Sequence, residues 1–526
     1  IMNTVHVLDC TLRDGGYCNQ WQFGHENTKK IILGLMDANI EIIECGFLTD
    51  KEEYNQDITK FNTLEQVAKV IPKKREGRLF VLMLNYGEYD IDRLPNYDGS
   101  SIDGFRIAFH KKDLSEAMEV CRRIIAKGYK VFVQAMVSLC YTDSEFLTLI
   151  EEVNKIEPYA FYIVDSFGMM KGKDLTRLFY MVEHNLQDNI WIGFHSHNNI
   201  QLAYSNAQTL VGLRTNRNLI IDSSVYGMGR GAGNLNTELF IDYLNANYQK
   251  KYQLKPLLTI IDDILNDFYQ QNYWGYSLPN YIAAMHNAHP NYAGYLDDKK
   301  TLTVENMNEI FDMMNEDKRY DYDKVYIEEL YLKFMEKERT QEEHLIELKQ
   351  ALKGKRVILI APGKSSVDQK QIVEAEARKE NTITISINHE YKHIEVNYIF
   401  TSNIRRFKEL SETVKHKCIV TSNIATEGIY LMTKYKNLLC TEEAVRDNAG
   451  LMAIKFLINY GVAEILLVGF DGYSHETREN YADKHLSFET KNTVLDAMNI
   501  GMEKVLKEYA GITRIRFLTT PRNVKI

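Results

Sequence analysis

Short apolar runs alternate with longer amphipathic segments from residue 5 to about residue 240. Apolar runs of about four to eight residues bounded by polar turns are typical of buried strands, and the segments between them have helical periodicity. Eight such runs occur, at residues 5–9, 40–47, 79–84, 104–109, 131–136, 161–165, 191–195 and 219–222. Eight strands with helices between them predict a parallel sheet closed into a (β/α)8 TIM barrel, which we assign to residues 2–240.

The pattern changes after residue 240. Residues 241–350 lack the alternation, and segments such as LKPLLTIIDDILNDFYQQ indicate a helical annex, which ends in a charged, solvated helix or linker over residues 328–355. A second α/β pattern begins at GKRVILIAPGKSS, continues with strand candidates at 382–387, 398–401 and 418–421, and ends with EILLVGFDGYS. Residues 351–526 are therefore predicted to form a Rossmann-like, doubly wound α/β domain.

Composition narrows the class of function. The chain has 526 residues, a net charge of -9 and a pI near 5.9, so it lacks the basic balance of a nucleic-acid binder or a binder of acidic membranes. Its seven cysteines form no CxxC pair and are odd in number, which argues against a disulfide scaffold or a thiolate zinc site. No apolar run approaches the roughly 18 residues of a membrane span. We expect a cytoplasmic protein that acts on small molecules.

Polar residues gather where the predicted barrel strands end. Glu44 lies on the second strand, Asp165 and Ser166 follow the sixth, His195 and His197 follow the seventh, and GMGRGAGN follows the eighth. In TIM barrels the catalytic groups sit at these carboxyl ends, in the loops after the strands. The sequence thus places candidate chemistry at one mouth of the barrel.

Two of these histidines suggest a metal site. His195 and His197 are two residues apart, so on a strand their side chains point to the same face. Asp14, on a neighbouring strand of the closed barrel, would lie beside them. Two imidazoles and a carboxylate suit a divalent ion, with manganese expected first and magnesium or zinc as alternatives, and leave positions open for substrate oxygens. In the alternative interpretation, HSHNN is a polar turn whose histidines only form hydrogen bonds.

Three motifs in this order, TLRDGG, GFHSHNN and GMGRGAGN, resemble the DRE-TIM metallolyases, the group of pyruvate-dependent aldolases, hydroxymethylglutaryl-CoA lyases and isopropylmalate synthases. The match is strongest to the branch of 4-hydroxy-2-oxovalerate aldolases. The resemblance covers roughly the first 240 residues. It implies that Asp14, His195 and His197 bind the ion and that Arg13 faces the substrate carbonyl. It also implies that Asn234 supplies a further ligand and that Ser166 bonds the substrate, although Ser166 could equally be a strand-end cap.

The chemistry also follows from general principles. Making or breaking a carbon bond next to a ketone passes through an enolate, which a Lewis-acidic ion chelated by a 2-oxo acid would stabilise together with Arg13. We therefore expect an aldolase that forms or cleaves a 4-hydroxy-2-oxo acid from pyruvate and an aldehyde, with Glu44 as the partner of Arg13. The alternatives are an acyl-CoA condensing or cleaving enzyme of the same group, or a nucleotide-sugar transferase in the C-terminal domain with the barrel as a scaffold.

The sequence leaves the general base unassigned, because Tyr17 stands at the position where the branches of this group differ. The synthase branch has glutamine there and the oxovalerate aldolases have a catalytic histidine, so Tyr17 argues against condensation with acetyl-CoA. Tyr17 near a cation could serve as the acid or base, or its ring could only shape the pocket. His289, in HNAHPNYAGYL, is a second candidate if the annex covers the barrel mouth; otherwise it is a solvated or helix-capping histidine.

The C-terminal domain resembles, more weakly, the Rossmann-like domain shared by sialyltransferase-type enzymes and pterin diphosphokinase-like proteins, through VILIAPGKSS and DNAGLMAIKFLINYGVAEILLVGFDGYSH. Gly363 and Ser365 in its glycine turn could contact a phosphate through backbone amides. Asp471 stands where a ribose or metal contact is expected. The module could equally be noncatalytic or purely structural. Barrels of this group are often homodimers, and the sequence itself shows no interface.

Overall fold

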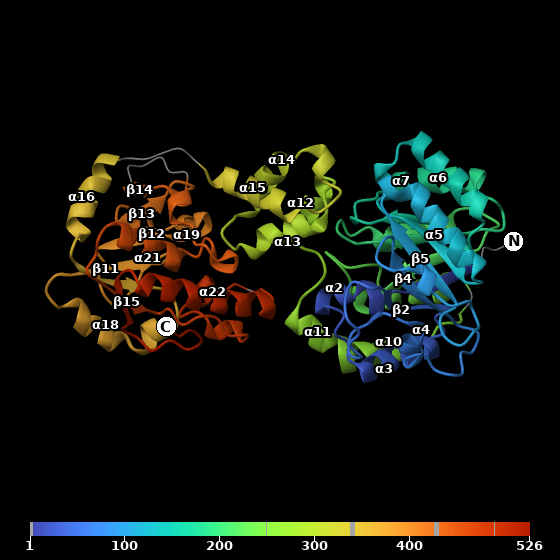
Figure 1. Ribbon diagram of the computed structural model, residues 1–526, viewed down its shortest axis with the longest axis horizontal. Helices are drawn as coiled ribbons and strands as arrows, with labels where there is room; N and C mark the ends of the chain where they lie inside the picture. The colour runs from blue at the N-terminus through green and yellow to red at the C-terminus, as the bar shows by residue number, and fades with distance from the viewer. Residues whose placement is uncertain (1–3, 249, 337–341, 425–430, 489, 526) are drawn as a thin grey trace. The chain divides into compact units, whose positions relative to one another are not determined.

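The computed structural model of the protein describes residues 4–248, 250–336, 342–424, 431–488 and 490–525. The chain divides into two units (Figure 1). The first comprises Ile1–Gly294 with Asn315–Tyr322, and the second comprises Tyr295–Met314 with Asp323–Ile526. The helical segment that follows the barrel is therefore shared between the two units. Among the described residues, no helix has both the length and the apolar character needed to cross a membrane.

The first unit contains the predicted barrel of eight parallel strands. Their order is β1-β9-β8-β7-β6-β5-β4-β2, and pairing of β1 with β2 closes the ring. Each predicted strand is present to within two residues at either end. The strands are β1 (Val5–Asp9), β2 (Ile42–Leu48), β4 (Leu79–Asn85), β5 (Gly104–Phe109), β6 (Lys130–Ala135), β7 (Ala160–Asp165), β8 (Trp191–Ser196) and β9 (Leu219–Ser223). A short strand, β3 (Lys60–Phe61), adds to β2 outside the ring.

The barrel is built from strands that are buried on both faces. Every residue of β2 is buried, as expected for a strand with the barrel interior on one side and helices on the other. Inside, Leu8, Phe132 and Tyr162 belong to one apolar cluster, and a much larger cluster fills the space between strands and helices. This double burial explains why the strands read as continuous apolar runs in the sequence.

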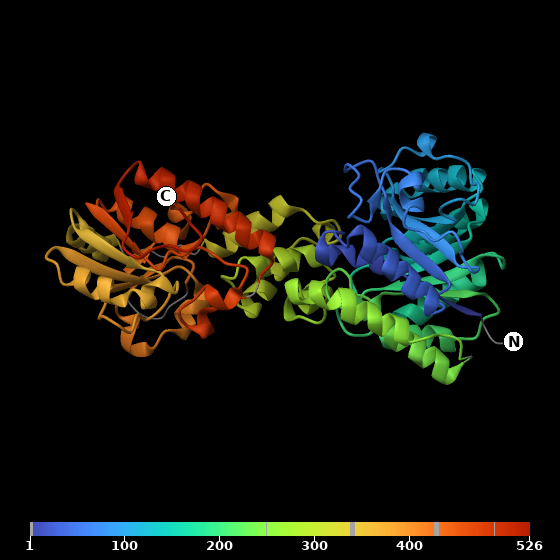
Figure 2. The same ribbon diagram turned by 90° about the horizontal axis from the view of Figure 1, so that it is seen from below.

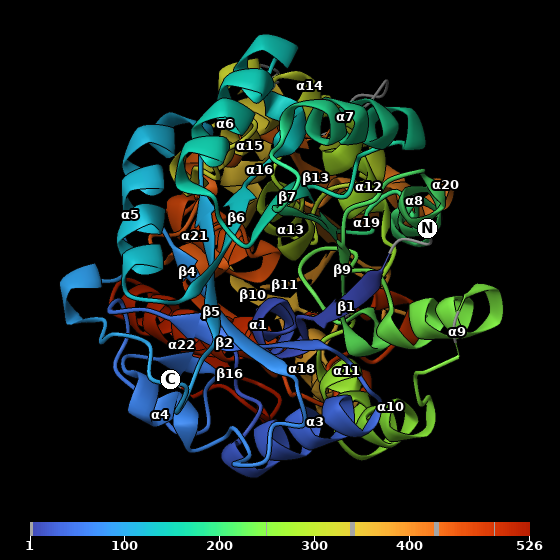
Figure 3. The same ribbon diagram turned by 90° about the vertical axis from the view of Figure 1, so that its right-hand side faces the viewer.

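Helices surround the strands (Figure 3). They are α3 (His25–Asp37), α4 (Leu64–Ala68), α5 (Leu114–Ala126), α6 (Asp143–Ile156), α7 (Gly172–Asn185), α8 (Ala203–Gly212) and α9 (Thr237–Asn247). The annex helix expected after the barrel is present as α10 (Lys255–Ile260), a π-helical turn over Ile261–Leu265, and α11 (Asn266–Gln271). It lies beside α3 (Figure 2). At this contact Gly34 of α3 gives room for the side chain of Ile260. The helices α12 (Leu278–Met285) and α13 (Pro290–Asp298) follow.

One expectation about the ring is wrong. Asp14 was expected on a strand next to the histidine strand, but β9 lies between β1 and β8. Asp14 instead ends α1 (Thr11–Asp14), the helical turn that follows β1. The residues beyond the strand, and not strand pairing, bring Asp14 to the histidines.

The second unit contains a parallel sheet in the order β14-β13-β12-β11-β10-β15-β16. The strands are β10 (Arg356–Ile360), β11 (Thr382–Ile387), β12 (Tyr398–Thr401), β13 (Cys418–Thr421), β14 (Leu431–Thr433), β15 (Glu464–Val468) and β16 (Arg514–Phe517). The chain moves outward from β10 to β14 and then returns to β15 on the other side of β10, which is the strand order of a doubly wound sheet. The two outermost strands were not predicted, because β14 is short and β16 alternates arginine with apolar residues.

The charged segment 328–355 is not simply solvated. Leu330 and Phe334 are buried on α15 (Lys324–Met335), and Leu348 and Leu352 are buried on α16 (Glu342–Leu352). Each pair has the i, i+4 spacing of an apolar helix stripe, which the high charge of the segment obscured. Residues 337–341 of this expected linker lie outside the described residues.

Packing inside the barrel predicts the effect of a single methyl group. A Cβ added at Gly193 on β8 would lie 2.2 Å from Cε2 of Tyr162, whose ring is fully buried. We expect Gly193→Ala to lower the free energy of unfolding of the barrel unit by about 2 kcal/mol, because the ring or the strand must move. All three tryptophans, Trp21, Trp191 and Trp274, lie in this unit, so urea unfolding followed by tryptophan fluorescence reports on it alone.

Gly212→Ala is the matched control. Gly212 ends α8, and a Cβ there would meet no atom within 4 Å. Its unfolding midpoint is expected to stay the same or to rise slightly. Equal midpoints for Gly193→Ala and the unsubstituted protein would contradict the packing described here.

Candidate active site

The turn after β1 is held by hydrogen bonds that bring distant segments together. Oδ1 of Asp9 accepts from the backbone amide of Thr11 at 2.9 Å, and Oδ2 accepts from the hydroxyl of Thr237 at 2.7 Å. The hydroxyl oxygen of Thr11 accepts from the amide of Val225 at 2.8 Å. A Cβ at Gly16 would lie 2.0 Å from the Trp21 ring. The glycine in TLRDGG therefore serves close packing, which fixes the position of Asp14.

Three buried side chains converge at the mouth of the barrel. Asp14, His195 and His197 each offer a ligand atom, and these atoms lie within 4.8 Å of one another. Nδ1 of His197 is 3.7 Å from Oδ2 of Asp14, and the two imidazole rings are nearly perpendicular at a centroid distance of 5.0 Å. The structure thus brings together the three residues that the sequence proposed as metal ligands.

Two buried polar atoms at this point have no hydrogen-bond partner among the described residues and could serve as ligands of a cation. Asn234, at the end of the glycine-rich loop, donates from Nδ2 to Oδ2 of Asp14 at 2.6 Å. Its Oδ1 is buried without a hydrogen-bond partner among the described residues, and so is Nδ1 of His197. Buried acceptors are normally satisfied, and a divalent ion accepts lone pairs from oxygen and nitrogen ligands. The donor set therefore fits the expected ion.

The protonation states also suit metal binding. Burial alone would raise the pKa of Asp14, but the neighbouring His197 and Arg13 outweigh burial and hold that pKa below its usual value. Burial lowers the pKa of His197 to about 3, although the carboxylate of Asp14 opposes this shift. At neutral pH the aspartate is thus ionised and the imidazole is neutral, which are the forms that bind metals.

A buried network of charges holds the cluster from below. Nε of Arg13 donates to Oε2 of Glu44 at 3.0 Å, and NH1 of Arg106 donates to the same oxygen at 2.7 Å. Arg106 also bonds Oδ2 of Asp222, and that oxygen lies 2.8 Å from Nδ1 of His195. With Nδ1 bonded to a carboxylate, His195 presents the lone pair of Nε2. Glu44 is the partner of Arg13, as expected.

Arg106 and Asp222 were missed in the sequence. Arg106 is fully buried in GFRIAF on β5, and Asp222 is buried in LIIDS on β9. The available signal was a charged residue inside an apolar strand, which is rare unless the charge is paired. These two residues link the two sides of the barrel interior, from Glu44 to His195.

Ser166 reaches the mouth at the end of β7. Its hydroxyl oxygen accepts from the backbone amide of Val137 at 2.8 Å, which leaves the hydroxyl hydrogen to be donated. Asp165 beside it accepts from the amides of Met169 and Met170 at 3.0 and 3.1 Å, and burial raises its pKa to about 7. Asp165 therefore organises the loop, and Ser166 keeps a donor available.

Tyr17 and His289 meet a third residue, Arg230 of the glycine-rich loop, at the outer rim of the mouth. The guanidinium carbon of Arg230 lies 5.3 Å from the ring centre of Tyr17, and its NH1 lies 3.4 Å from Nε2 of His289. Its NH2 donates to the carbonyl of Ser166 at 3.3 Å. Burial, reinforced by Arg230, holds the pKa of His289 well below its usual value. The annex thus places His289 at the mouth. The motif GMGRGAGN contains Arg230, but nothing in the sequence indicated that this arginine contacts Tyr17 and His289.

In the second unit, a carboxylate of the protein itself, that of Asp471, is hydrogen-bonded to the glycine turn that follows β10. Oδ2 of Asp471 accepts from the amide of Ser365 at 2.8 Å. A Cβ at Gly363 would lie 2.2 Å from the carbonyl oxygen of Gly469. The structure thus brings Gly363, Ser365 and Asp471 together and gives each a structural use. A ligand-binding role for them stays a prediction.

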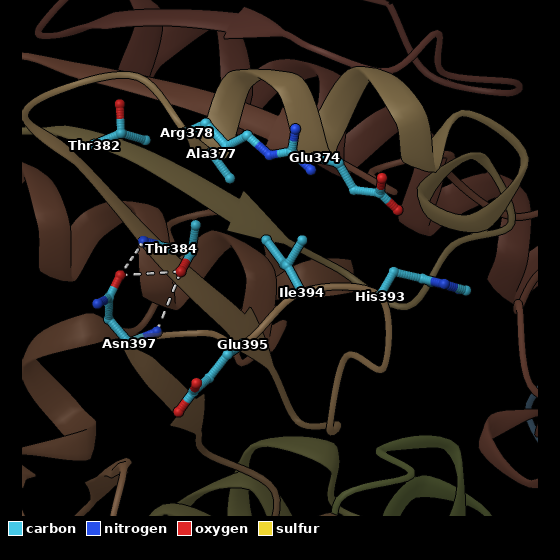
Figure 4. Close-up of a pocket in the computed structure, with 9 residues that line it drawn as sticks. All are labelled: Glu374, Ala377, Arg378, Thr382, Thr384, His393, Ile394, Glu395 and Asn397. Atoms are coloured by element: carbon cyan, nitrogen blue, oxygen red, sulfur yellow. Dashed lines mark hydrogen bonds between the residues drawn. The ribbon is translucent and has the colours of Figure 1, made fainter.

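A separate pocket of about 460 Å³ lies in the second unit (Figure 4). It is lined by Glu374, Ala377, Arg378, Thr382, Thr384, His393, Ile394, Glu395 and Asn397. Oδ1 of Asn397 accepts from the amide of Thr384 at 2.9 Å and from its hydroxyl at 3.0 Å. This pocket includes none of Gly363, Ser365 and Asp471, and its Thr384 and Asn397 are hydrogen-bonded to each other.

Comparison with known proteins identifies relatives of the barrel. Residues 4–264 match the HMGL-like family. The 4-hydroxy-2-oxovalerate aldolase of Pseudoalteromonas translucida is 26% identical over 268 residues, covering 50% of this chain and 76% of that enzyme. The enzyme of the same name from Pelotomaculum thermopropionicum is 28% identical over 275 residues, covering 50% and 77%. The crystal structure of the N-terminal domain of a candidate aldolase from Bacteroides vulgatus is 25% identical with a TM-score of 0.48, covering 57% of this chain and 98% of that domain.

The network below the cluster predicts a loss of metal affinity. Asp222→Asn removes the charge that orients His195, so we expect Mn²⁺ to bind about 10- to 100-fold more weakly in isothermal titration calorimetry. Arg106 keeps its bond to Glu44 in this variant. Asp242→Asn, at an exposed position of α9, is the matched control and should bind Mn²⁺ like the unsubstituted protein. Unchanged affinity in Asp222→Asn would show that the network does not support the cluster.

Proposed function

We propose that the barrel of this chain, whose residues 4–264 belong to the HMGL-like family, is a divalent-metal-dependent aldolase that forms or cleaves a 4-hydroxy-2-oxo acid. The proposed 2-oxo acid is pyruvate, the proposed ion is Mn²⁺, and the proposed location is the cytoplasm. The observation that carries the proposal is the convergence of Asp14, His195 and His197, with ligand atoms within 4.8 Å of one another, beside the guanidinium of Arg13.

The residues that would hold the ion are Asp14, His195, His197 and Asn234. When bound, a divalent ion would supply a Lewis acid that polarises the 2-oxo group of the substrate. In the cleavage direction the 4-hydroxyl group loses its proton to a base and the bond between C3 and C4 breaks. The electron pair of that bond passes to the three-carbon fragment, and a proton is then added at C3 to give pyruvate, while C4 leaves as an aldehyde.

Arg13 is placed to stabilise the developing negative charge. Its Nε and NH1 are bonded to Glu44 and Asp14, whereas NH2 is buried without a hydrogen-bond partner among the described residues. A preorganised, desolvated donor of this kind favours the transition state over the ground state. The hydroxyl hydrogen of Ser166 is a second donor, and we propose that it bonds the substrate carboxylate or carbonyl.

The base remains a choice between Tyr17 and His289. Both side chains contact the guanidinium of Arg230, so both lie at the outer side of the mouth. His289 is neutral, and its Nδ1 lies 3.1 Å from the amide nitrogen of Asn291 while its Nε2 lies 3.4 Å from NH1 of Arg230. Only one of the two ring nitrogens can accept, and His289 can act as the base in the tautomer that leaves Nε2 unprotonated. Tyr17 is 38% exposed and packs edge-on against Trp21. Either group could exchange a proton with the 4-hydroxyl of a substrate held between the cluster and the rim.

The first reaction step can be tested without any aldehyde. We expect the Mn²⁺-loaded protein to exchange the methyl protons of pyruvate in deuterium oxide, as followed by proton NMR, because the site stabilises the charge formed when a proton leaves C3. His195→Ala and excess chelator should each abolish the exchange. The exposed His184→Ala is the matched control and should exchange at the rate of the unsubstituted protein. A protein that binds Mn²⁺ and shows no exchange would contradict an aldolase and favour a barrel that serves as a scaffold.

The base can be identified by comparing Tyr17→Phe with His289→Gln. The variant that lacks the base should lower kcat for aldol cleavage by about 10²- to 10⁴-fold and remove one limb of the pH profile. The other variant should change kcat by less than about 10-fold, because its residue only shapes the rim. Similar small losses in both variants would exclude both residues as the base.

A further inference from the structure

Arg230 occupies a position that the aldol chemistry described above does not use. It lies in the glycine-rich loop after β9, and Gly229 before it lies directly over the cluster, because a Cβ there would be 2.8 Å from Oδ2 of Asp14. Its side chain crosses to the carbonyl of Ser166 after β7 and to Nε2 of His289 in the annex. One guanidinium therefore spans the mouth between three separate segments.

The contacts of this guanidinium are with uncharged groups. They are a carbonyl, a neutral imidazole and the ring of Tyr17, and among the described residues no carboxylate lies at ion-pair distance from Arg230. Its Nε is buried and has no hydrogen-bond partner in the part of the chain that is described. A half-buried cation without a counter-charge is costly unless a ligand supplies the missing anion.

The carboxylates of the inner site are already paired with other arginines; Asp14 is near enough for the charge of Arg230 to contribute to lowering its pKa, but its ion pair is with Arg13. In the hydrogen-bonded network, Arg13 and Arg106 face Asp14, Glu44 and Asp222, which leaves one excess negative charge. A divalent ion would turn this into one excess positive charge, and the carboxylate of a 2-oxo acid would cancel it. Arg230 would then still carry an unbalanced positive charge next to the reacting groups.

The position of Arg230 suits contact with the second substrate, the aldehyde, and not with the 2-oxo acid. The ligand side chains are buried, with Asp14 1% and His197 4% exposed, whereas Tyr17 beneath the Arg230 guanidinium is 38% exposed. A three-carbon acid chelated by an ion at this cluster would lie on the buried side of Arg230. The aldehyde must approach from the solvent side, past Arg230, Tyr17 and His289.

We infer that Arg230 binds an anionic group on the acceptor aldehyde, so that the second substrate is an aldehyde bearing a carboxylate or a phosphate. This inference rests on the proposed aldolase function and adds the class of its second substrate. Carboxylate and phosphate present the same chemistry to a guanidinium, which donates two hydrogen bonds in one plane to either group.

The test compares pairs of aldehydes in which one member carries an anionic group and the other does not. Condensation with pyruvate is measured for 4-oxobutanoate against butanal, and for glyceraldehyde 3-phosphate against glyceraldehyde, at saturating pyruvate and Mn²⁺. We expect kcat/KM for the anionic member of at least one pair to be about 10- to 100-fold above that for the neutral member, as befits a charged hydrogen bond. The pair with the larger ratio distinguishes a carboxylate from a phosphate.

Variants then assign the preference to Arg230. Arg230→Gln should reduce the ratio of anionic to neutral kcat/KM to near one, while Arg230→Lys should keep part of it. The ratio is taken within one variant, so a partial loss of folded protein does not alter it. Arg214→Gln removes the same charge from an exposed loop that precedes β9 and should leave the ratio unchanged.

Two results would overturn the inference alone: equal use of charged and neutral aldehydes by a protein that exchanges pyruvate protons, or an Arg230→Gln variant whose KM rises for pyruvate while its aldehyde ratio is retained. Absence of both pyruvate exchange and condensation would overturn the proposed function together with the inference.

Discussion

The buried ion-pair network between Arg13, Glu44, Arg106, Asp222 and His195 is the interaction on which the site depends. Charges this deep in a barrel are tolerable only when each is paired and hydrogen-bonded, so every member constrains the position of the next. The network starts at the turn after β1, crosses the interior on β2 and β5, and ends on β9 and β8. It therefore fixes one ligand histidine and the proposed oxyanion donor relative to each other.

Above this network the mouth has two layers with different tasks. The inner layer contains Asp14, His195 and His197, which are all buried, and the pKa shifts of Asp14 and His197 keep these two residues in metal-binding protonation states. The outer layer contains Tyr17, His289 and Arg230, which come from the first turn, the annex and the glycine-rich loop. In the proposed aldol reaction both layers are needed, because the inner one would activate the 2-oxo acid and the outer one would receive the aldehyde and exchange the proton.

Much of the barrel could be predicted from the sequence because its strands are buried on both faces and read as apolar runs. The histidine pair was recognisable because two residues along a strand share a face. The route of Asp14 to that pair was not, since it depends on one helical turn after β1. Arg106 and Asp222 were also missed, because a pairing across the barrel interior leaves no local pattern. In the second unit the apolar stripes of α15 and α16 were hidden by charged neighbours.

The most direct test of the central claim is a crystal structure of the protein with Mn²⁺ and pyruvate, with anomalous diffraction at the manganese edge. The account predicts one anomalous peak per chain, coordinated by Asp14, His195 and His197, with pyruvate oxygens in the remaining positions and Arg13 beside them. Absence of an anomalous peak at these three residues under saturating Mn²⁺, or a peak coordinated elsewhere, would contradict the account.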